Sequence, residues 1–264
     1  MAARSRSVAR RIVVWSRRAE TRASLKGLNW CDTVCETAEE AVREADLVVV
    51  CTPVEHIVPT VENIAGAIRP GALVTDVGSV KGAIVRHATA ALAGRAHFIG
   101  AHPMAGSDKT GHIHGHADLF RGRPCFLTPL PDSDPDAVEK AAAFWSALDA
   151  IVVRESPETH DEIVAHISHL PHAIASALCA YLADKNPLWR DLAGPGLRDT
   201  TRIAGGDADL WRGIFALNRD ELLRAIKGYQ DALEALQAAI ANNDPLAVRS
   251  ILERGRNYRE GLPG

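Results

Sequence analysis

The first half of the chain alternates short apolar runs with longer stretches in which apolar residues recur every three or four positions. The apolar runs predict buried strands and the periodic stretches predict amphipathic helices. The expected strands are RIVVW (11–15), DLVVVC (46–51), ALVTDV (72–77), HFIG (97–100) and PCFLT (124–128), and the expected helices cover 36–45, 55–68 and 81–94, with one more helix and strand in 137–153. Such strands, separated by helices, predict a parallel, doubly wound α/β sheet covered on both faces, Rossmann-like in type.

The pattern changes near residue 156, and no strand is expected after it. Residues 157–185 form one long helical pattern, which Pro171 is expected to kink or split near residue 168 because proline lacks an N–H. A last helix is expected to begin at Pro245. We therefore expect two domains, an α/β domain over 1–154 of the type that binds nucleotides and an all-α domain over 155–264.

One helix of the second half has a coiled-coil-like seam. Its apolar residues follow a 4-3-4-3-4 spacing and are Leu222, Ile226, Tyr229, Leu233, Leu236 and Ile240. This spacing fits packing within the chain and a homodimer interface equally well, so the sequence leaves both open.

Composition and charge exclude some classes of partner. The chain has 264 residues, 47% of them hydrophobic and 24% charged, with a net charge of −3. This charge gives no general attraction to nucleic acid or to anionic membranes, and no uninterrupted apolar run reaches the roughly 18 residues of a membrane span. We expect a cytoplasmic protein with reduced, buried thiols and no metal, in which HIHGH (112–116) is a polar loop.

Arginine is abundant at the start of the chain. Residues 1–18 hold six Arg and no acidic residue. This is similar to an organellar presequence, but it also fits the exposed end of a helix. The second interpretation is favoured because the first expected strand begins at once.

Three expected strand ends carry unusual polar segments: CTPVEH (51–56), DVGSVKG (76–82) and GAHPMAGSDKTG (100–111). Each combines a Gly or Pro turn with a small hydroxyl or a titratable side chain. Because a doubly wound sheet binds ligands at the carboxyl ends of its strands, these segments together predict an active site. His102 has the side chain best suited to accept a proton near neutral pH.

The chain resembles the prephenate/arogenate dehydrogenase family of tyrosine biosynthesis. The resemblance is carried by the segments that follow the expected strands together with SHLPHAIASAL (168–178) and GLRDTTRIAGGDADLWRGI (196–214). The resemblance runs from about residue 8 to residue 258. It implies oxidative decarboxylation of a cyclohexadienol: hydride passes from the carbon bearing the hydroxyl to a nicotinamide, the ring carboxyl leaves as CO2, and the ring becomes aromatic.

The resemblance also implies roles for particular residues. His102 matches the catalytic histidine, and Ser79 matches a serine that hydrogen-bonds the same substrate hydroxyl, although it can also cap a helix. Arg202 matches the arginine that holds a substrate carboxylate, with a salt bridge to Asp199 or Asp207 as the alternative. We expect His102 and Arg202 to face each other across an interdomain cleft.

The remaining expected substrate-site residues are His172, His160, Ser107, Asp108 and Trp211. Of these, Trp211 fits a core position almost as well as a pocket wall. His166 and His169 are expected to have surface or core roles rather than to contact ligands.

The cofactor segment departs from the family pattern. The chain contains no G-x-G-x-x-G, and MAARSRSVA is similar to the end of the helix that follows that turn in the family. We therefore expect that the first strand and the glycine-rich turn, roughly 20–25 residues, are missing. Assignment of the start codon too far downstream and a real truncation both explain this. Weak or no cofactor binding is expected from residues 1–264 alone.

The end of the first strand bears on the choice of cofactor. Ser16, Arg17 and Arg18 stand where an acidic residue would bind the ribose diol of NAD. A hydroxyl and two guanidiniums suit a 2′-phosphate, so NADP is favoured and NAD stays possible. The other expected cofactor contacts are Thr52, Pro53, Asp76 and Gly78.

Two other functions are consistent with the sequence. One is an NADP-dependent hydroxyacid or imine reductase of the same architecture. Such enzymes place a catalytic Lys in the helical domain, whereas here only Lys185 and Lys227 follow residue 155, in no matching motif. The other is a truncated, cofactor-free dimerisation or regulatory module.

Overall fold

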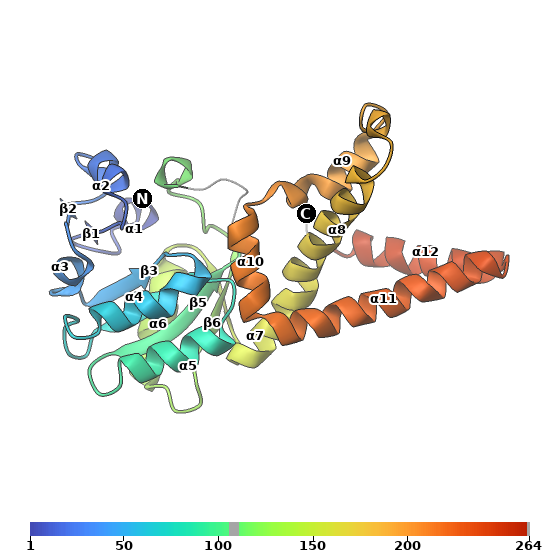
Figure 1. The fold of residues 1–264 in the computed structure, drawn as a ribbon. Helices are drawn as coiled ribbons and strands as arrows, with labels where there is room; N and C mark the ends of the chain where they lie inside the picture. Colours follow the sequence, from blue (N-terminus) through green and yellow to red (C-terminus); the bar gives the residue numbers. More distant parts are fainter. Residues whose placement is uncertain (106–110, 263–264) are drawn as a thin grey trace. The chain divides into compact units, whose positions relative to one another are not determined.

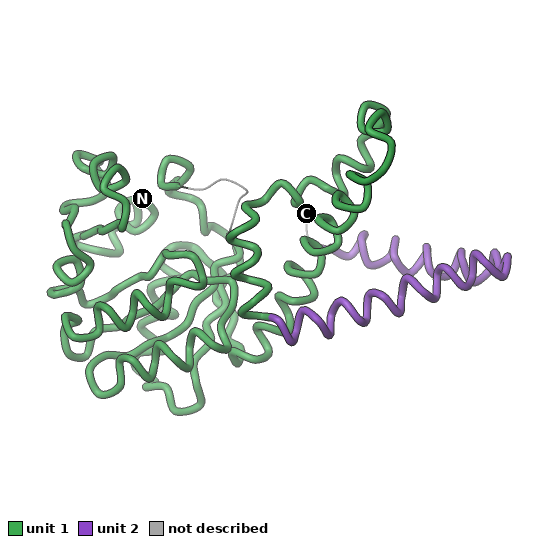
Figure 2. Tube along the Cα trace, in the orientation of Figure 1, with its two compact units in different colours: residues 1–218 green, residues 219–264 purple. Residues whose placement is uncertain are grey.

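A computed structural model describes residues 1–105 and 111–262. The chain separates into two compact units, residues 1–218 and 219–264 (Figure 2). The domain boundary expected at residue 154 lies inside the first unit and stays a prediction.

The first unit is built on a five-stranded sheet (Figure 1). Its strands, in spatial order, are β3 (Leu47–Val50), β4 (Leu73–Asp76), β5 (His97–Pro103), β6 (Pro124–Thr128) and β7 (Ile151–Arg154). Neighbouring strands are parallel except β5 and β6, which run antiparallel with Gly100 opposite Thr128. The expectation of an all-parallel sheet is therefore wrong at one pair. The described residues between β5 and β6 hold no α-helix, only the short η1 (His112–His114), and antiparallel neighbours need no helical crossover.

A separate two-stranded sheet precedes this one. It pairs β1 (Val13–Val14) with β2 (Thr33–Val34) in parallel, with α2 (Ala19–Leu25) between them. β2 was not expected from the sequence, because it is only two residues long. In the described part of the chain no ladder joins β1 or β2 to β3. The nearby α1 (Ala2–Ser5) is tied to this sheet by an Arg4–Asp32 ion pair.

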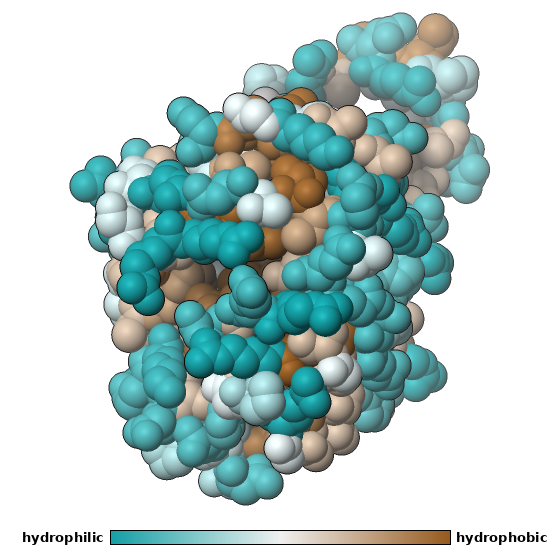
Figure 3. All heavy atoms as spheres, turned by 90° about the vertical axis from the view of Figure 1, so that its left-hand side faces the viewer, coloured by the Kyte–Doolittle hydropathy of each residue, from teal (hydrophilic) through white to brown (hydrophobic). Residues whose placement is uncertain are grey.

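Helices cover both faces of the larger sheet. On one face α3 (Ala38–Val42), α4 (Val54–Ile64) and α5 (Gly82–Ala91) pack through buried residues such as Ile57 and Ile84. On the other face α6 (Pro135–Ala147) packs through Trp145, which is 1% exposed. Thr37 caps α3 and forms a full capping box with Glu40. Hydrophilic side chains dominate the surface seen in Figure 3, with apolar ones exposed among them.

The long helical stretch is interrupted as expected. It consists of α7 (Pro157–Val164), a π-helical segment η2 (Ala165–His169) and α8 (Leu170–Ala183). The irregular segment lies directly before Pro171, which cannot donate a backbone hydrogen bond. By length and composition alone Pro157–Ala183 could span a membrane, since its most apolar window has a mean hydropathy of 1.3. However, the stretch also contains buried His160 and Asp161, which bond to residues of the sheet domain as described below.

Shorter helices complete the first unit. They are η3 (Pro187–Arg190), α9 (Pro195–Thr201), η4 (Arg202–Gly205) and α10 (Ala208–Leu217). Ile214 of α10 belongs to the core formed by α4 and α5, and Arg212 Nη2 lies 3.4 Å from Glu55 Oε2. These contacts fix α10 against the helices of the sheet domain.

The second unit is a helical hairpin of α11 (Arg219–Ala241) and α12 (Pro245–Glu260). Asp244 caps α12 by accepting hydrogen bonds from the N–H groups of Leu246 and Ala247. In the seam of α11, Tyr229, Leu233 and Ile240 are 40–62% exposed.

Candidate active site

A buried ion pair shapes the turn after β4. Lys81 and Asp76 are both 0% exposed, and Lys81 Nζ contacts the Asp76 carboxylate and donates to the Ala101 carbonyl at 2.9 Å. Burial lowers the pKa of Lys81, while the Asp76 carboxylate raises it in part. Asp76 also accepts from Gly78 N at 2.9 Å and from Ala101 N at 3.1 Å. The carboxylate therefore ties β4, its turn and β5 together.

Gly78 is required by close packing in the same turn. A Cβ at this position would lie 2.6 Å from Ile57 Cδ1 and 2.9 Å from Asp76 Oδ2. A side chain at this position would force the turn, the end of the Ile57 side chain or the Asp76 carboxylate to shift. The glycine thus sets the path of the backbone that leads to Ser79.

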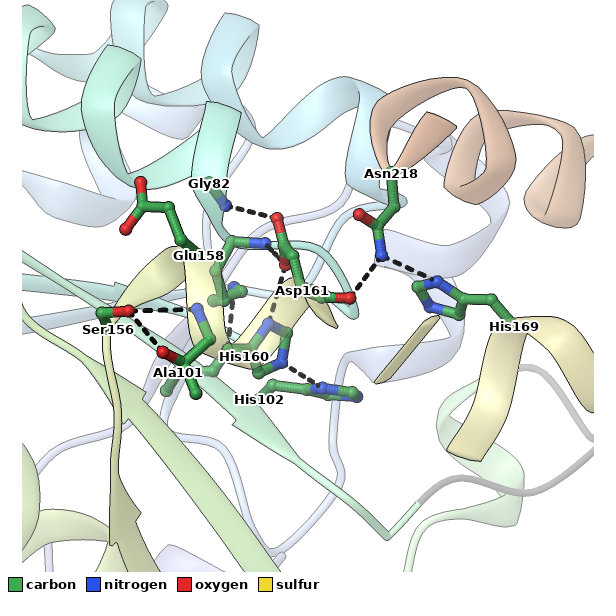
Figure 4. A network of polar contacts seen from close by, with 12 residues as sticks. Gly82, Ala101, His102, Ser156, Glu158, His160, Asp161, His169 and Asn218 are labelled. Atoms are coloured by element: carbon green, nitrogen blue, oxygen red, sulfur yellow. Dashed lines mark hydrogen bonds and ion pairs between the residues drawn. The ribbon is translucent and has the colours of Figure 1, made fainter. Parts of the chain in front are cut away.

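A chain of three polar residues leads away from the end of β5 (Figure 4). His102 Nδ1 lies 2.9 Å from His160 Nε2, and His160 Nδ1 lies 2.8 Å from Asp161 Oδ1. The Asp161 carboxylate also accepts from the N–H groups of Lys81 and Gly82, each at 2.8 Å. Asp161 thereby joins the start of α5 to the helix that carries His160.

These contacts assign the protons on both rings. A carboxylate only accepts hydrogen bonds, so His160 Nδ1 carries the proton that it donates to Asp161. The Nε2 atom of the neutral His160 ring is therefore unprotonated. His102 Nδ1 must then donate to His160 Nε2. In the neutral ring the other nitrogen, His102 Nε2, is left with its lone pair, and no described residue bonds to it. This is the form of histidine that accepts a proton.

Burial keeps these histidines neutral. His102 is 8% exposed and His160 is 0% exposed. Desolvation is the largest cause that lowers the pKa of His102 well below its usual 6.5, and neighbouring His160 and Lys81 lower it further. Desolvation also lowers the pKa of His160, although Asp161 opposes it. His102 is therefore a base that stays unprotonated at neutral pH.

A second group of expected residues meets in the helical part of the first unit. His172 stacks on Trp211 with ring centroids 3.5 Å apart. The two rings line a pocket of about 430 Å³ between α8, η4 and α10, together with Gly206 and Phe215. At Gly206 a Cβ would lie 2.7 Å from Trp211 Nε1, so the glycine lets the backbone approach the stacked rings. The aromatic wall suits a planar or cyclic ligand.

The other expected residues lie apart from these two clusters. Arg202 is exposed at the start of η4, and no described residue bonds to its guanidinium, so the alternative salt bridge does not form. Thr52 and Pro53 follow β3, where Thr52 Oγ1 is buried without a partner among the described residues. Ser107 and Asp108 lie outside the described residues.

At the end of β1 the expected cofactor residues are accessible. Arg17 and Arg18 are exposed, and Arg18 is the N-cap residue of α2. Arg22 Nη1 donates to the Ser16 carbonyl at 2.8 Å and to the Arg17 carbonyl at 3.1 Å, which fixes the backbone of this turn. Both guanidiniums at 17 and 18 stay available to a ligand.

Sequence reasoning missed residues that organise the site. Asp161 directly follows His160, and this adjacent His–Asp pair was a usable signal. Lys81 ends the DVGSVK segment, where its burial could not be read from the sequence. His169 and Asn218 are both buried, and their mutual contact depends on how α10 ends beside η2.

Comparison with known proteins gives the family. Residues 1–154 match the family described as "Prephenate dehydrogenase, nucleotide-binding domain", and residues 156–254 match "Prephenate dehydrogenase, dimerization domain". The chain belongs to the prephenate dehydrogenase family. The fold, with a Rossmann-like domain followed by helices, agrees with this assignment.

Several members of the prephenate dehydrogenase family are similar over most of this chain. Prephenate dehydrogenase of Bacillus subtilis is 34% identical over 91% of this chain, which spans 66% of that protein. Cyclohexadienyl dehydrogenase of Zymomonas mobilis is 33% identical over 83% of this chain and 76% of that protein. The chain thus spans about two thirds to three quarters of the length of these relatives.

Solved structures of the family superpose closely. Prephenate dehydrogenase from Aquifex aeolicus, in complex with hydroxyphenyl propionate and NAD+, has a TM-score of 0.92 at 28% identity, covering 98% of this chain and 91% of that one. Arogenate dehydrogenase from Synechocystis has a TM-score of 0.84 at 30% identity, covering 98% and 94%. These relatives are oxidoreductases.

Proposed function

We propose that the protein catalyses the oxidative decarboxylation of prephenate or arogenate, with transfer of hydride to NAD(P). The observation that carries the proposal is the neutral His102, whose Nε2 lone pair is set by His160 and Asp161. Membership of the family favours this function over a hydroxyacid or imine reductase and over a module without cofactor. The products would be 4-hydroxyphenylpyruvate from prephenate and tyrosine from arogenate.

The chemistry assigned to His102 is that of a general base. Its Nε2 accepts the proton of the ring hydroxyl while the carbon that bears this hydroxyl loses hydride. The ring carboxylate leaves as CO2, its bonding electrons complete the aromatic ring, and the resulting phenolate oxygen takes the proton back from His102. A bound nicotinamide supplies the hydride acceptor. His102 is already neutral, and its Nδ1 is hydrogen-bonded to His160. No proton therefore has to leave the base before the reaction starts.

The remaining contacts to substrate follow from the second cluster. His172 and Trp211 would form the walls around the ring, and the guanidinium of Arg202, to which no described residue bonds, would hold a carboxylate. Ser79 would hydrogen-bond the hydroxyl beside His102. We propose that this whole set forms one site between the sheet domain, 1–154, and the helical domain, 155–264.

For the cofactor we propose NADP in preference to NAD. The residues present fit its 2′-phosphate, since Arg17 and Arg18 are exposed at the end of β1 and the Ser16 backbone is fixed by Arg22. Thr52, Pro53 and Gly78 follow the ends of β3 and β4, where a nucleotide lies in sheets of this type. Asp76 supports the turn through its internal bonds.

The preference can be tested with fragments of the cofactor. Calorimetry should show that 2′,5′-ADP binds more tightly than 5′-ADP, and that Arg17→Ala with Arg18→Ala removes the difference. Arg43→Ala, at the exposed C-cap position of α3, serves as the matched control. Equal affinities for the two fragments in the unsubstituted protein would contradict the preference for NADP.

The proposed reaction itself is tested by offering prephenate and arogenate, each with NAD and with NADP. Reduced nicotinamide and CO2 should appear in equal amounts with at least one pair. Turnover of a 3-hydroxyacid or a cyclic imine with no turnover of either cyclohexadienol would favour the reductase. No turnover of any substrate, at cofactor concentrations at which calorimetry shows binding, would contradict the proposed reaction.

We also propose a cytoplasmic homodimer formed through the helical domain. The family's dimerisation domain covers residues 156–254, and Tyr229, Leu233 and Ile240 expose an apolar seam along α11. Leu233→Glu should shift the protein from dimer to monomer in analytical ultracentrifugation, because a charge would be buried in the interface. Gln237→Glu on the same helix is the control, and an unchanged dimer in the Leu233 variant would contradict the interface.

A further inference from the structure

A second branch of hydrogen bonds starts from the backbone of Asp161 (Figure 4). The Asp161 carbonyl accepts from Asn218 Nδ2 at 2.9 Å, and the same nitrogen lies 3.1 Å from His169 Nδ1. A carbonyl only accepts, so this contact fixes which end of the Asn218 amide is the NH2 group. That group then donates to His169 Nδ1, which must be unprotonated. The neutral ring of His169 therefore carries its proton on Nε2.

The Nε2–H of His169 is a buried donor without an acceptor. The side chain is 0% exposed, and Nε2 has no hydrogen-bond partner among the described residues. Burial lowers the pKa of His169 to about 4, so the ring is neutral at pH 7 and keeps this donor. Leaving a buried donor unpaired reduces stability, so an acceptor for this N–H is expected.

One candidate acceptor is the backbone of the turn that carries Ser79. The backbone of Ser79 lies close enough to His169 to raise its pKa in part, although no hydrogen bond is completed. Two residues further along, the N–H groups of Lys81 and Gly82 are held by the Asp161 carboxylate. Asp161 therefore fixes the turn at the end that leads into α5.

We propose that His169 is a positioning residue whose Nε2–H bonds the Ser79 carbonyl when ligand fills the site, and so fixes the Ser79 hydroxyl. The inference rests on the proposed function, in which Ser79 contacts the substrate hydroxyl. Hydrogen bonds in empty active sites are often long and tighten only in the complex. Asp161 would then anchor both groups that meet the hydroxyl, His102 through His160 and Ser79 through Asn218 and His169.

The proton on His169 can be observed without turnover. In protein labelled with 15N in its histidines, and with the signals assigned by His169→Asn, nitrogen spectra should show His169 protonated at Nε2 near neutral pH. Addition of 3-(4-hydroxyphenyl)propionate should shift this Nε2–H and slow its exchange with water. A proton on Nδ1, or an Nε2–H that is unaffected by bound ligand, would overturn the inference.

Ligand affinity separates positioning from a general loss of structure. His169→Asn keeps an acceptor for Asn218 but removes Nε2, and should weaken binding of 3-(4-hydroxyphenyl)propionate about threefold to tenfold, as expected for one hydrogen bond. His169→Gln places an amide N–H near the lost donor and should restore most of the affinity. In a Ser79→Ala background, His169→Asn should weaken binding of this ligand very little, because the Ser79 hydroxyl that His169 positions is absent.

The outcomes also separate this inference from the proposed function. If the unsubstituted protein does not bind the ligand, the proposed function fails and the inference fails with it. If the unsubstituted protein binds but His169→Asn binds equally well, only the inference is wrong. An undiminished effect of His169→Asn in the Ser79→Ala background would likewise overturn it.

Discussion

At the scale of single residues, Asp161 connects more of the site than any residue chosen from the sequence. Its carboxylate accepts hydrogen bonds from His160 Nδ1 and from the N–H groups of Lys81 and Gly82. Its backbone carbonyl accepts one from Asn218 Nδ2. Each of these contacts requires an acceptor, and an amide side chain offers one acceptor fewer than a carboxylate. The negative charge and the two oxygens are therefore both needed.

We expect Asp161→Asn to lower kcat/KM about tenfold or more and to reduce the free energy of unfolding by about 1–3 kcal/mol. The new NH2 group would face either a backbone N–H or the donor of His160, which disturbs the proton arrangement on His102. Steady-state kinetics and urea unfolding measure the two effects. Glu158→Gln, on the same helix in an exposed pair with Arg86, should change neither. Kinetics of Asp161→Asn like those of the unsubstituted protein would contradict the role of Asp161.

The sequence predicted some of these residues better than others. His102 and His160 were named and lie in contact, as do His172 and Trp211. Asp161 was not named, because a carboxylate in an amphipathic helix looks solvent-facing until the partner helix is placed. The meeting of His102 with Arg202 stays a prediction.

At the scale of elements, the turn after β4 depends on a close approach to α4. Gly78 leaves no room for a side chain between Ile57 and Asp76. The hydrophobic pattern located β4 and α5 within a few residues, but it could not show how tightly the turn between them packs. The pattern also predicted which segments form strands but not the direction in which each strand runs. The antiparallel pairing of β6 with β5 was therefore unexpected.

Gly78→Ala should destabilise the protein by about 1–3 kcal/mol, because the added methyl overlaps Ile57 and the Asp76 carboxylate. Thermal unfolding followed by circular dichroism measures the change. Gly66→Ala is the matched control, since a Cβ there meets nothing within 4 Å. If the two variants unfold at the same temperature, the turn is less tightly packed than the structure indicates.

At the scale of the whole molecule, the buried histidines make stability depend on pH. Burial lowers the pKa values of His102, His160, His169 and His172. Below a pH of about 6.5 the unfolded chain binds protons at these side chains, whereas folded His169 resists protonation down to about pH 4. Unfolding is therefore favoured progressively as the pH falls through this window, and the full contribution to stability is present above it.

We expect the melting temperature to fall between about pH 7 and about pH 5, before most carboxylates are protonated. His169→Asn should flatten the slope, because it removes one group that titrates only in the unfolded chain. His87→Asn, at an exposed position of α5, should leave the slope unchanged. A melting temperature independent of pH over this range would contradict the buried, neutral histidines.

The central claim is that His102 is the base that takes the substrate proton, and the most direct test is the turnover of His102→Asn. With prephenate or arogenate and saturating cofactor, this variant should lose about 10²- to 10⁴-fold in kcat while still binding 3-(4-hydroxyphenyl)propionate, and His87→Asn should keep full activity. If His102→Asn turned over substrate as fast as the unsubstituted protein, the account of the site would be contradicted.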